Sequence, residues 1–261
     1  MTALYAAPKR IFMKISVITA VYNRAATIGE ALHSVQSQSW ENTEHVLQDG
    51  GSTDGTLDIL QSQSDPRMSL LSERDDGIYD AINRGKARAT GDVVGLMHSD
   101  DIFAHNRVLE QVAYAFSDPA VDCVYGDLQY VAADDTDRVI RHWTSGGYSR
   151  DLLPRGWMPP HPTFYIRRSL LEKYGAYDTS FQIAADYDAM LRWLWTHELR
   201  PAYIPEVMVK MRVGGESNRS LGRILQKSRE DYRALKRNKV GGIGALAQKN
   251  FSKIKQFRPQ K

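Results

Sequence analysis

Short apolar runs alternate with amphipathic segments along the first half of the chain. The β-branched run at 14–20 predicts a buried parallel strand. Apolar residues at helical spacing follow it: Ile28, Ala31, Leu32 and Val35. Further strands are predicted at 44–48, 68–72, 92–97 and 121–125. Helices are predicted to begin at Leu57 and to span 78–89 and 107–116. This alternation predicts an α/β fold with a mostly parallel central sheet and helices on both faces.

The pattern changes after about residue 127. Residues 128–156 contain aromatic residues and glycines without a clear period, and we expect mixed strand and loop there. A turn and short strand are predicted at 159–168, followed by a brief helix at 169–174. An apolar stripe from Ile183 to Leu194 predicts a helix with Asp186 in or just before its first turn. We divide 13–215 into the halves 13–127 and 128–215, and treat 216–261 as a basic helical tail.

Acidic residues stand at three predicted strand ends, namely Asp49, the pair Asp75 and Asp76, and the pair Asp100 and Asp101. The carboxyl ends of parallel strands share one edge, where such folds bind ligands. Adjacent carboxylates need a partner, and Mg²⁺ or Mn²⁺ binds carboxylates while leaving sites for phosphates. The alternative is structural, because residues 99–101 resemble a helix cap.

The loop DGGSTDGT at 49–56 has two interpretations. Its glycines turn the chain, and Ser52, Thr53 or Asp54 would cap a helix. Alternatively, the carboxylate of Asp49 accepts hydrogen bonds from the base or ribose of a nucleotide. The loop lacks the spacing of a Walker loop or of a dinucleotide fingerprint.

The ordered set of motifs resembles the family 2 glycosyltransferases of the GT-A fold. The motifs are VITAVYN at 17–23, DGGSTDGT at 49–56, DGIYDAINRG at 76–85, SDD at 99–101 and ADYD at 185–188. The resemblance covers about residues 14–215. It implies that 13–127 is the nucleotide-sugar-binding half and 128–215 the acceptor-side half. It implies an inverting transfer of sugar from a nucleotide-diphosphate sugar, with a UDP-sugar favoured as donor and with Mn²⁺ or Mg²⁺ as cofactor.

The resemblance also implies roles for individual residues. The nucleotide side would comprise Ala20, Tyr22, Asn23 and Asp49 at the nucleoside, Asp75 or Asp76 with Arg84 beside the base or diphosphate, and Asp100 near the ribose and metal. Asp101 would bind the metal, and Asp186 matches the catalytic base. Two positions depart from the family pattern. His98 replaces a frequent first acid, and Ala185 replaces a frequent Glu beside Asp186.

The proposed chemistry needs the acids at the metal, Asp100 and Asp101, and the base, Asp186. A metal neutralises the charge of the leaving nucleoside diphosphate, while a carboxylate base removes the proton of the attacking hydroxyl. Asp186 is expected to be that base, with a plain helix N-cap as the alternative.

Four more residues carry open alternatives. His161 is a candidate for the metal, the diphosphate or the acceptor, although a lone histidine is commonly structural. Arg212 is a candidate phosphate ligand in a flap with the following glycines, or part of a surface loop. Trp143 and Trp157 would stack on an acceptor sugar or pack in the interior.

The tail differs in charge from the rest of the chain. Residues 219–261 contain 13 basic and 2 acidic residues, whereas the remainder contains 21 basic and 29 acidic. Apolar residues recur among these basic ones, so we expect an amphipathic helix on an anionic membrane surface, near a lipid-linked acceptor. The alternative is a helix packed on the catalytic body.

The composition bears on the cellular compartment of the protein. Cys123 is the single cysteine of the sequence, so an internal disulfide is excluded and a reducing compartment is the default. The sequence contains no apolar run of about 20 residues that would span a bilayer. We expect a cytoplasmic protein, peripheral at the inner face of the cell membrane, with no nucleic-acid partner.

The hypothesis is therefore a metal-dependent glycosyltransferase that builds a surface polysaccharide or glycolipid, with a glycan or lipid-linked acceptor. One alternative is a non-catalytic protein that binds nucleotides or polyanions. Another is a nucleotidyltransferase, which would release pyrophosphate. Neither donor sugar nor linkage follows from the sequence.

Overall fold

The computed structural model describes residues 12–214 and 221–256, and within these residues one sheet contains nine strands. The strands are β1 (Ile15–Val21), β2 (Thr43–Asp49), β3 (Met68–Ser72), β4 (Val93–Leu96), β5 (Ile102–Phe103), β6 (Cys123–Val131), β7 (Val139–Trp143), β8 (Tyr165–Arg167) and β9 (Pro201–Arg212). The α-helices are α1 (Ile28–Gln36), α2 (Thr56–Gln61), α3 (Ile78–Arg88), α4 (Val108–Ala115), α5 (Arg168–Tyr174), α6 (Ala185–Leu191), α7 (Leu221–Arg237) and α8 (Ile243–Gln256). A π-helical turn, η3 (Arg192–Thr196), continues α6, and the short 3₁₀ helices are η1 (Arg150–Arg155) and η2 (His161–Thr163).

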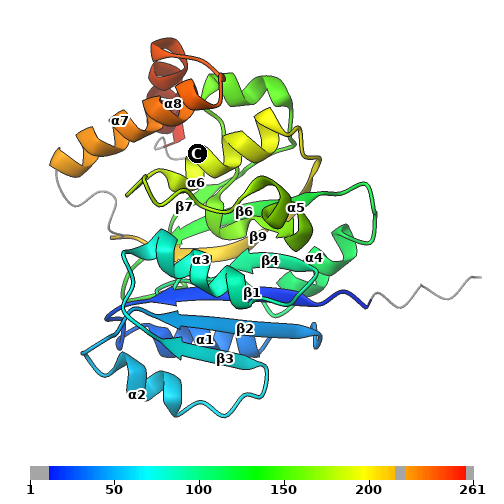
Figure 1. Ribbon diagram of the computed structural model, residues 1–261, viewed down its shortest axis with the longest axis vertical. Helices are drawn as coiled ribbons and strands as arrows, with labels where there is room; N and C mark the ends of the chain where they lie inside the picture. Colours follow the sequence, from blue (N-terminus) through cyan, green and yellow to red (C-terminus); the bar gives the residue numbers. More distant parts are fainter. Residues whose placement is uncertain (1–11, 215–220, 257–261) are drawn as a thin grey trace, which may run out of the picture.

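The strand order is β3-β2-β1-β4-β8-β6-β9-β5, with β7 paired to β6 (Figure 1). The first four strands are parallel, and the long β6–β9 ladder is parallel too. This confirms the mostly parallel sheet. The fifth predicted strand, at 121–125, begins at Cys123 and continues to Val131. The three-residue strand β8 lies antiparallel between β4 and β6.

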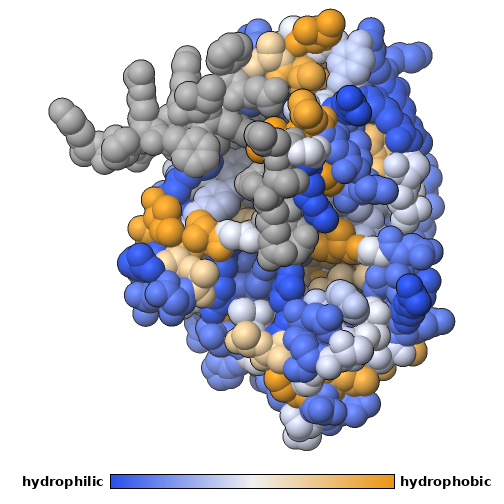
Figure 2. Space-filling model, turned by 90° about the vertical axis from the view of Figure 1, so that its left-hand side faces the viewer, coloured by the Kyte–Doolittle hydropathy of each residue, from blue (hydrophilic) through white to orange (hydrophobic). Residues whose placement is uncertain are grey.

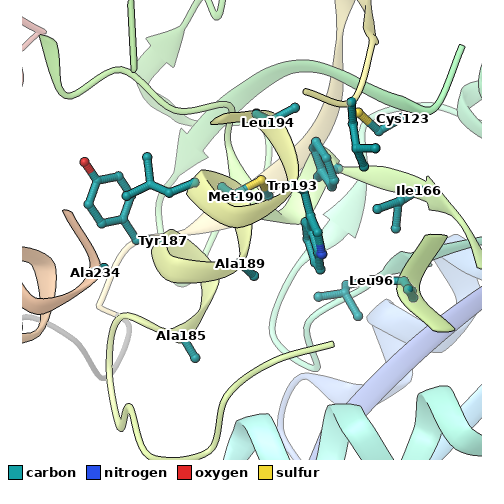
Figure 3. Close-up of a cluster of buried hydrophobic side chains, with 14 of the residues drawn as sticks. Leu96, Cys123, Ile166, Ala185, Tyr187, Ala189, Met190, Trp193, Leu194 and Ala234 are labelled. Carbon is teal, nitrogen blue, oxygen red and sulfur yellow. The ribbon is translucent and has the colours of Figure 1, made fainter. Parts of the chain in front are cut away.

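Helices cover both faces of the sheet, as the pattern predicts. Val17 and Ile18 are buried neighbours on β1 and pack into different hydrophobic clusters, because successive strand residues face opposite sides. Val17 shares its cluster with apolar residues of α1 and α4, whereas Ile18 shares its cluster with residues of α3, α5 and α6. Figure 3 shows the part of the second cluster around α6, where Trp193 lies near Leu96 and Ile166.

The helices α7 and α8 pack against the body beside α6 (Figure 1). Ala234 and Leu235 of α7 are fully buried in the cluster that contains α6. The alternative of a packed tail helix therefore holds for this part of α7. No helix within 12–214 or 221–256 has the length and apolar composition needed to cross a membrane.

The boundaries of the predicted regions are partly visible. The division at 127/128 falls inside β6, so the two predicted halves share that strand. The boundary at 215/216, the flap glycine at 215 and the first residues of the basic tail, 216–220, lie outside the described residues.

Candidate active site

The carboxyl ends of β1, β2 and β3 lie at one level, because Val21 pairs with Asp49 and Asp49 pairs with Ser72. These ends point to the left in Figure 1, and Figure 2 looks onto that side of the molecule, where hydrophilic and hydrophobic residues are interspersed. The predicted edge therefore exists.

The loop after β1 is joined to the loop after β2. Asn23 has a left-handed backbone with φ of 52°, a conformation that asparagine tolerates better than most residues. Its backbone N–H donates to Ser52 Oγ over 2.9 Å, and its Oδ1 accepts from the Thr53 N–H over 2.8 Å. Ala20 is half-buried, while Tyr22 keeps 57% of its surface exposed at the rim. Tyr22 is thus accessible to a ligand, whereas Asn23 is engaged in shaping the loop.

Asp49 is fully buried at the end of β2. Its Oδ2 accepts hydrogen bonds from the N–H groups of Gly51 and Ser52, each over 3.1 Å, and from Ser72 Oγ over 2.6 Å. Its Oδ1 accepts from Ser52 Oγ over 2.5 Å. These contacts give Asp49 a role in holding the 50–52 turn, and its contact with a nucleoside stays a prediction.

Of the pair Asp75 and Asp76, the first faces the rim. A Cβ added at Gly50 would lie 2.6 Å from Asp75 Oδ2, so this carboxylate lies directly against the turn after β2. Burial raises the pKa of Asp75, and the charges of Asp80 and Asp49 raise it further. Asp76 is exposed.

Arg84 lies on α3 and pairs with two acids near this rim. The distances from its guanidinium are 2.9 Å to Asp80 and 3.3 Å to Glu73. Its side chain is about one-third exposed, at 32%, so it remains accessible from solvent. The predicted contact of Arg84 with a diphosphate stays a prediction.

Asp100 and Asp101 form a turn after β4, which the end of β9 holds in place. Asp101 is buried, and its Oδ1 accepts the Arg212 backbone N–H over 3.0 Å. Its Oδ2 is buried without a hydrogen-bond partner among the described residues. Burial and the charge of Asp100 raise the pKa of Asp101 well above its usual value. The capping alternative is wrong, since the next helix, α4, begins only at Val108 and has Arg107 at its N-cap.

Arg212 is buried behind this turn and is not a loop residue. Its Nη1 donates to the Asp100 carbonyl over 2.6 Å, its Nη2 to Glu30 over 2.6 Å, and its Nε to the Ala133 carbonyl over 3.2 Å. The surface-loop alternative is wrong for this residue, because it ends β9. Each guanidinium nitrogen has a protein acceptor, which suits a residue that supports the Asp100–Asp101 turn.

Asp186 lies in the first turn of α6, where it does not act as the N-cap. The N-cap is Ala184, and no side chain of the cap residue bonds the helix end. Asp186 Oδ1 accepts from the Tyr187 N–H over 2.8 Å and lies 3.3 Å from the Tyr79 hydroxyl. The N-cap alternative is therefore wrong, and the carboxylate is half-buried.

Two histidines, His98 and His161, lie between the Asp100–Asp101 turn and Asp186. The rings of His98 and His161 lie 5.9 Å apart, and His161 Nε2 lies 2.8 Å from the Tyr177 hydroxyl. Tyr177 in turn stacks on Tyr79, the neighbour of Asp186. Burial lowers the pKa of His161 to about 4, opposed by the charge of Asp186.

His98 is the residue on which both acids act. Burial lowers its pKa, and the negative charges of Asp100 and Asp186 oppose this shift. Asp100 and Asp186, which lie far apart in the sequence, are thus both near enough to His98 to act on its charge. That they form one site stays a prediction. The sequence alone does not mark Tyr79 or Tyr177 as site residues, because neither stands at a strand end.

The Asp100–Asp101 turn has the donor atoms of a partial site for a divalent cation, which phosphates of a substrate would complete. No group of three or more His, Cys, Asp or Glu side chains among the described residues could hold a metal. Magnesium-type sites use one or two carboxylates together with substrate phosphates. The unpaired, buried Oδ2 of Asp101 beside Asp100 supplies that kind of partial site. His161 would offer its remaining ring nitrogen, since Nε2 lies against Tyr177.

The two tryptophans named for the acceptor are half-buried. Trp143 stacks on Tyr130, with 6.5 Å between ring centroids. Trp157 contacts Tyr125 edge-on and donates from Nε1 to the Ser145 carbonyl over 3.1 Å. Their packing is accounted for within the chain, and stacking on a sugar stays a prediction.

The chain belongs to glycosyl transferase family 2, since the model of that family matches residues 16–183. It is 30% identical over 215 residues to a Mycobacterium tuberculosis protein named PGL/p-HBAD biosynthesis glycosyltransferase, with 78% of each chain covered. An uncharacterized glycosyltransferase of the same organism is 32% identical over 183 residues, with 68% of each chain covered. The chain is therefore a glycosyltransferase.

Solved structures share the fold. One is the mannosyltransferase PcManGT from Pyrobaculum calidifontis in complex with GDP-Man and Mn²⁺, at TM-score 0.66 and 18% identity, covering 92% of this chain and 69% of the other. Another is S. aureus TarS 1-349 in complex with UDP-GlcNAc, at TM-score 0.63 and 20% identity, covering 91% and 70%. The fold is that of the GT-A glycosyltransferases, as the resemblance implies.

Proposed function

We propose that the protein transfers a sugar, with inversion, from a nucleotide-diphosphate sugar to a hydroxyl of a glycan or lipid-linked acceptor. The observation that carries the proposal is a series of contacts from His98, beside the Asp100–Asp101 turn, to Asp186. It runs through the side chains of His161, Tyr177 and Tyr79. We assign Asp186 to the acceptor hydroxyl and the Asp100–Asp101 pair to the diphosphate. Inverting transfer needs these two functions on opposite sides of the anomeric carbon.

In the proposed reaction, Asp186 accepts the proton of the acceptor hydroxyl. The hydroxyl oxygen bonds to the anomeric carbon while the bond from that carbon to the diphosphate oxygen breaks. The electron pair leaves with the nucleoside diphosphate. A bound Mn²⁺ or Mg²⁺ would neutralise phosphate charge, held by Asp100 and Asp101 with His161 as a further candidate ligand.

On the donor side, we assign the exposed ring of Tyr22 and the carboxylate of Asp75 to the base. Both lie at the rim beside the turn that Asp49 holds. Asp100 would reach the ribose. Arg212 is assigned a supporting role for the turn, since its guanidinium is already bonded to three acceptors. A UDP-sugar is the first donor to test, because solved neighbours carry UDP-GlcNAc as well as GDP-Man.

The acceptor proposal draws on the relatives and on α7. One of the two mycobacterial relatives is named for PGL/p-HBAD biosynthesis, which favours a role in surface polysaccharide or glycolipid synthesis. Ile224 and Leu225 on the first turns of α7 are 47% and 62% exposed. Apolar side chains on a basic helix suit contact with anionic lipid. We therefore propose that the protein works peripherally at the inner face of the membrane.

The membrane proposal is tested by sedimentation with vesicles that contain anionic lipid. An Ile224→Ser/Leu225→Ser variant leaves the buried residues of α7 unchanged, whereas removal of the whole tail would not. We expect wild type to bind these vesicles several times better than this variant and better than neutral vesicles. Equal binding in all arms contradicts the proposal.

The enzymatic proposal is tested with a panel of nucleotide sugars and Mn²⁺. A ligand that binds the native state raises the unfolding temperature, so a thermal-shift screen identifies the donor. Release of nucleoside diphosphate then supports glycosyl transfer. Release of pyrophosphate supports a nucleotidyltransferase, and tight binding without release supports a non-catalytic binding protein.

A further inference from the structure

Glu230 of α7 is a buried carboxylate that binds the chain immediately before Asp186. Its Oε2 accepts the backbone N–H groups of Ile183 and Ala184 over 2.8 and 2.9 Å. Its Oε1 accepts the N–H of Gln182 over 3.2 Å. Three consecutive backbone donors therefore converge on one side chain from a helix 46 residues further along the chain.

These donors need a partner because of the local geometry. The N–H groups of residues 182–184 precede the first turn of α6, so the helix itself supplies no acceptor for them. A buried N–H without a partner destabilises the folded state. The carboxylate of Glu230 removes that cost and fixes the direction of the chain as it enters α6.

A second side chain, from α3 in the half 13–127, holds the same segment. The Tyr79 hydroxyl on α3 donates to the Ile183 carbonyl over 2.7 Å. Ile183 is thus held by its N–H from α7 and by its carbonyl from α3. Asp186 follows three residues later, so its place depends on both contacts.

The docking of α7 does not depend on Glu230 alone. Asn238 donates to the buried carboxylate of Asp188 over 2.9 Å. Asp231 and Lys249 form a buried ion pair of 2.7 Å between α7 and α8. Ala234 and Leu235 add fully buried apolar contact. These contacts are expected to keep α7 in place when Glu230 is replaced.

We propose that Glu230 is a positioning residue for the catalytic carboxylate, which makes α7 a working part of the transferase. This inference rests on the proposed role of Asp186. Loss of the Glu230 carboxylate should therefore slow the chemical step more than it weakens binding of the nucleotide sugar. The residues proposed to bind the nucleotide sugar lie at the ends of β1 to β4, away from α7.

The test compares Glu230→Ala and Glu230→Gln with Arg229→Ala, an exposed neighbour on the same helix. Hydrogen exchange is measured on the amides of 182–184, with those of β1 as an internal reference. We expect exchange at 182–184 to rise at least tenfold in Glu230→Ala, less in Glu230→Gln and not in Arg229→Ala, while β1 is unchanged. Equal exchange at 182–184 in all three variants overturns the inference, even if no donor is known.

Kinetics give the second readout. With the donor found in the panel, we expect kcat of Glu230→Ala to fall at least tenfold while the donor KM stays within twofold, and Glu230→Gln to recover part of the loss. A kcat within twofold of Arg229→Ala overturns the positioning role. If wild type turns over but Asp186→Asn does as well, the proposed base fails instead, and the exchange result still decides on Glu230.

Discussion

The backbone N–H of Arg212 donates to Oδ1 of Asp101 over 3.0 Å, while Oδ2 of the same carboxylate is buried without a partner among the described residues. One oxygen therefore fixes the side chain, and the other is available. Burial raises the pKa of this group. A nearby cation would lower that pKa again, because it favours the ionised form.

This arrangement predicts the behaviour of Asp101→Asn. The amide keeps an oxygen for the Arg212 N–H, so the unfolding temperature in EDTA should stay within about 2 °C of wild type or rise. Stabilisation by Mn²⁺ together with UDP should be lost, because a ligand oxygen is missing. Thermal shift with and without Mn²⁺ measures both effects. A full metal-dependent shift in the variant would show that Asp101 is not a ligand.

Arg212 provides a test that separates support from phosphate binding. Arg212→Met removes three hydrogen bonds and should lower the free energy of unfolding by about 2 kcal/mol. The control Glu30→Gln keeps an acceptor for Nη2 and should change it by less than about 0.5 kcal/mol. Urea unfolding measures both. An Arg212→Met protein of normal stability that no longer binds UDP would instead favour the phosphate-ligand hypothesis.

Two glycines give opposite predictions for the same substitution. A Cβ at Gly95 on β4 would lie 2.1 Å from the Tyr165 ring, so Gly95→Ala should destabilise the protein by at least about 2 kcal/mol. Gly29 on α1 is exposed with nothing within 4 Å of an added Cβ. Gly29→Ala should stabilise by about 0.5 kcal/mol through helix propensity. Equal effects in urea unfolding would mean that β4 and β8 do not pack as described.

Histidine 45 predicts a pH dependence of stability. Its ring is buried on β2 with Nε2 2.9 Å from Thr19 Oγ1, and burial lowers its pKa from 6.5 to about 3. Between these values the unfolded chain binds a proton that the folded protein does not, so stability falls as pH falls through this window. The loss from about pH 7 to about pH 4 should be about 3 kcal/mol.

The control is His45→Gln, which keeps a polar atom near Thr19 and cannot titrate. The difference in unfolding free energy between wild type and this variant should vary with pH in that window and be constant above about pH 7. A difference that is independent of pH would show that His45 is protonated in the folded protein.

The sequence predicted the first half of the fold well, because local patterns determine it. The run at 68–72 coincides with β3, and the helix predicted at 78–89 corresponds to α3 at Ile78–Arg88. It did not predict that β8 separates β4 from β6. A three-residue strand has no period, and its position depends on pairing with Val94 and Cys123, which are distant in the chain.

The same distinction applies to the site. Acids at parallel strand ends were predictable, since strand ends meet at one edge. The contact of Tyr79 with Asp186 joins residues 107 positions apart, and the contact of Glu230 with Ala184 joins α7 to α6. Within a basic helix, a single glutamate carries no sign of this role. Such contacts require the packed structure.

The central claim concerns Asp186, and single-turnover measurement with the donor identified by the screen tests it most directly. Asp186→Asn should bind the nucleotide sugar and Mn²⁺ with a Kd within about threefold of wild type, because the residues proposed to bind them are unchanged. Its transfer rate should fall at least about a hundredfold, the contribution typical of a general base. A variant that binds the donor and transfers sugar at the wild-type rate would contradict the account.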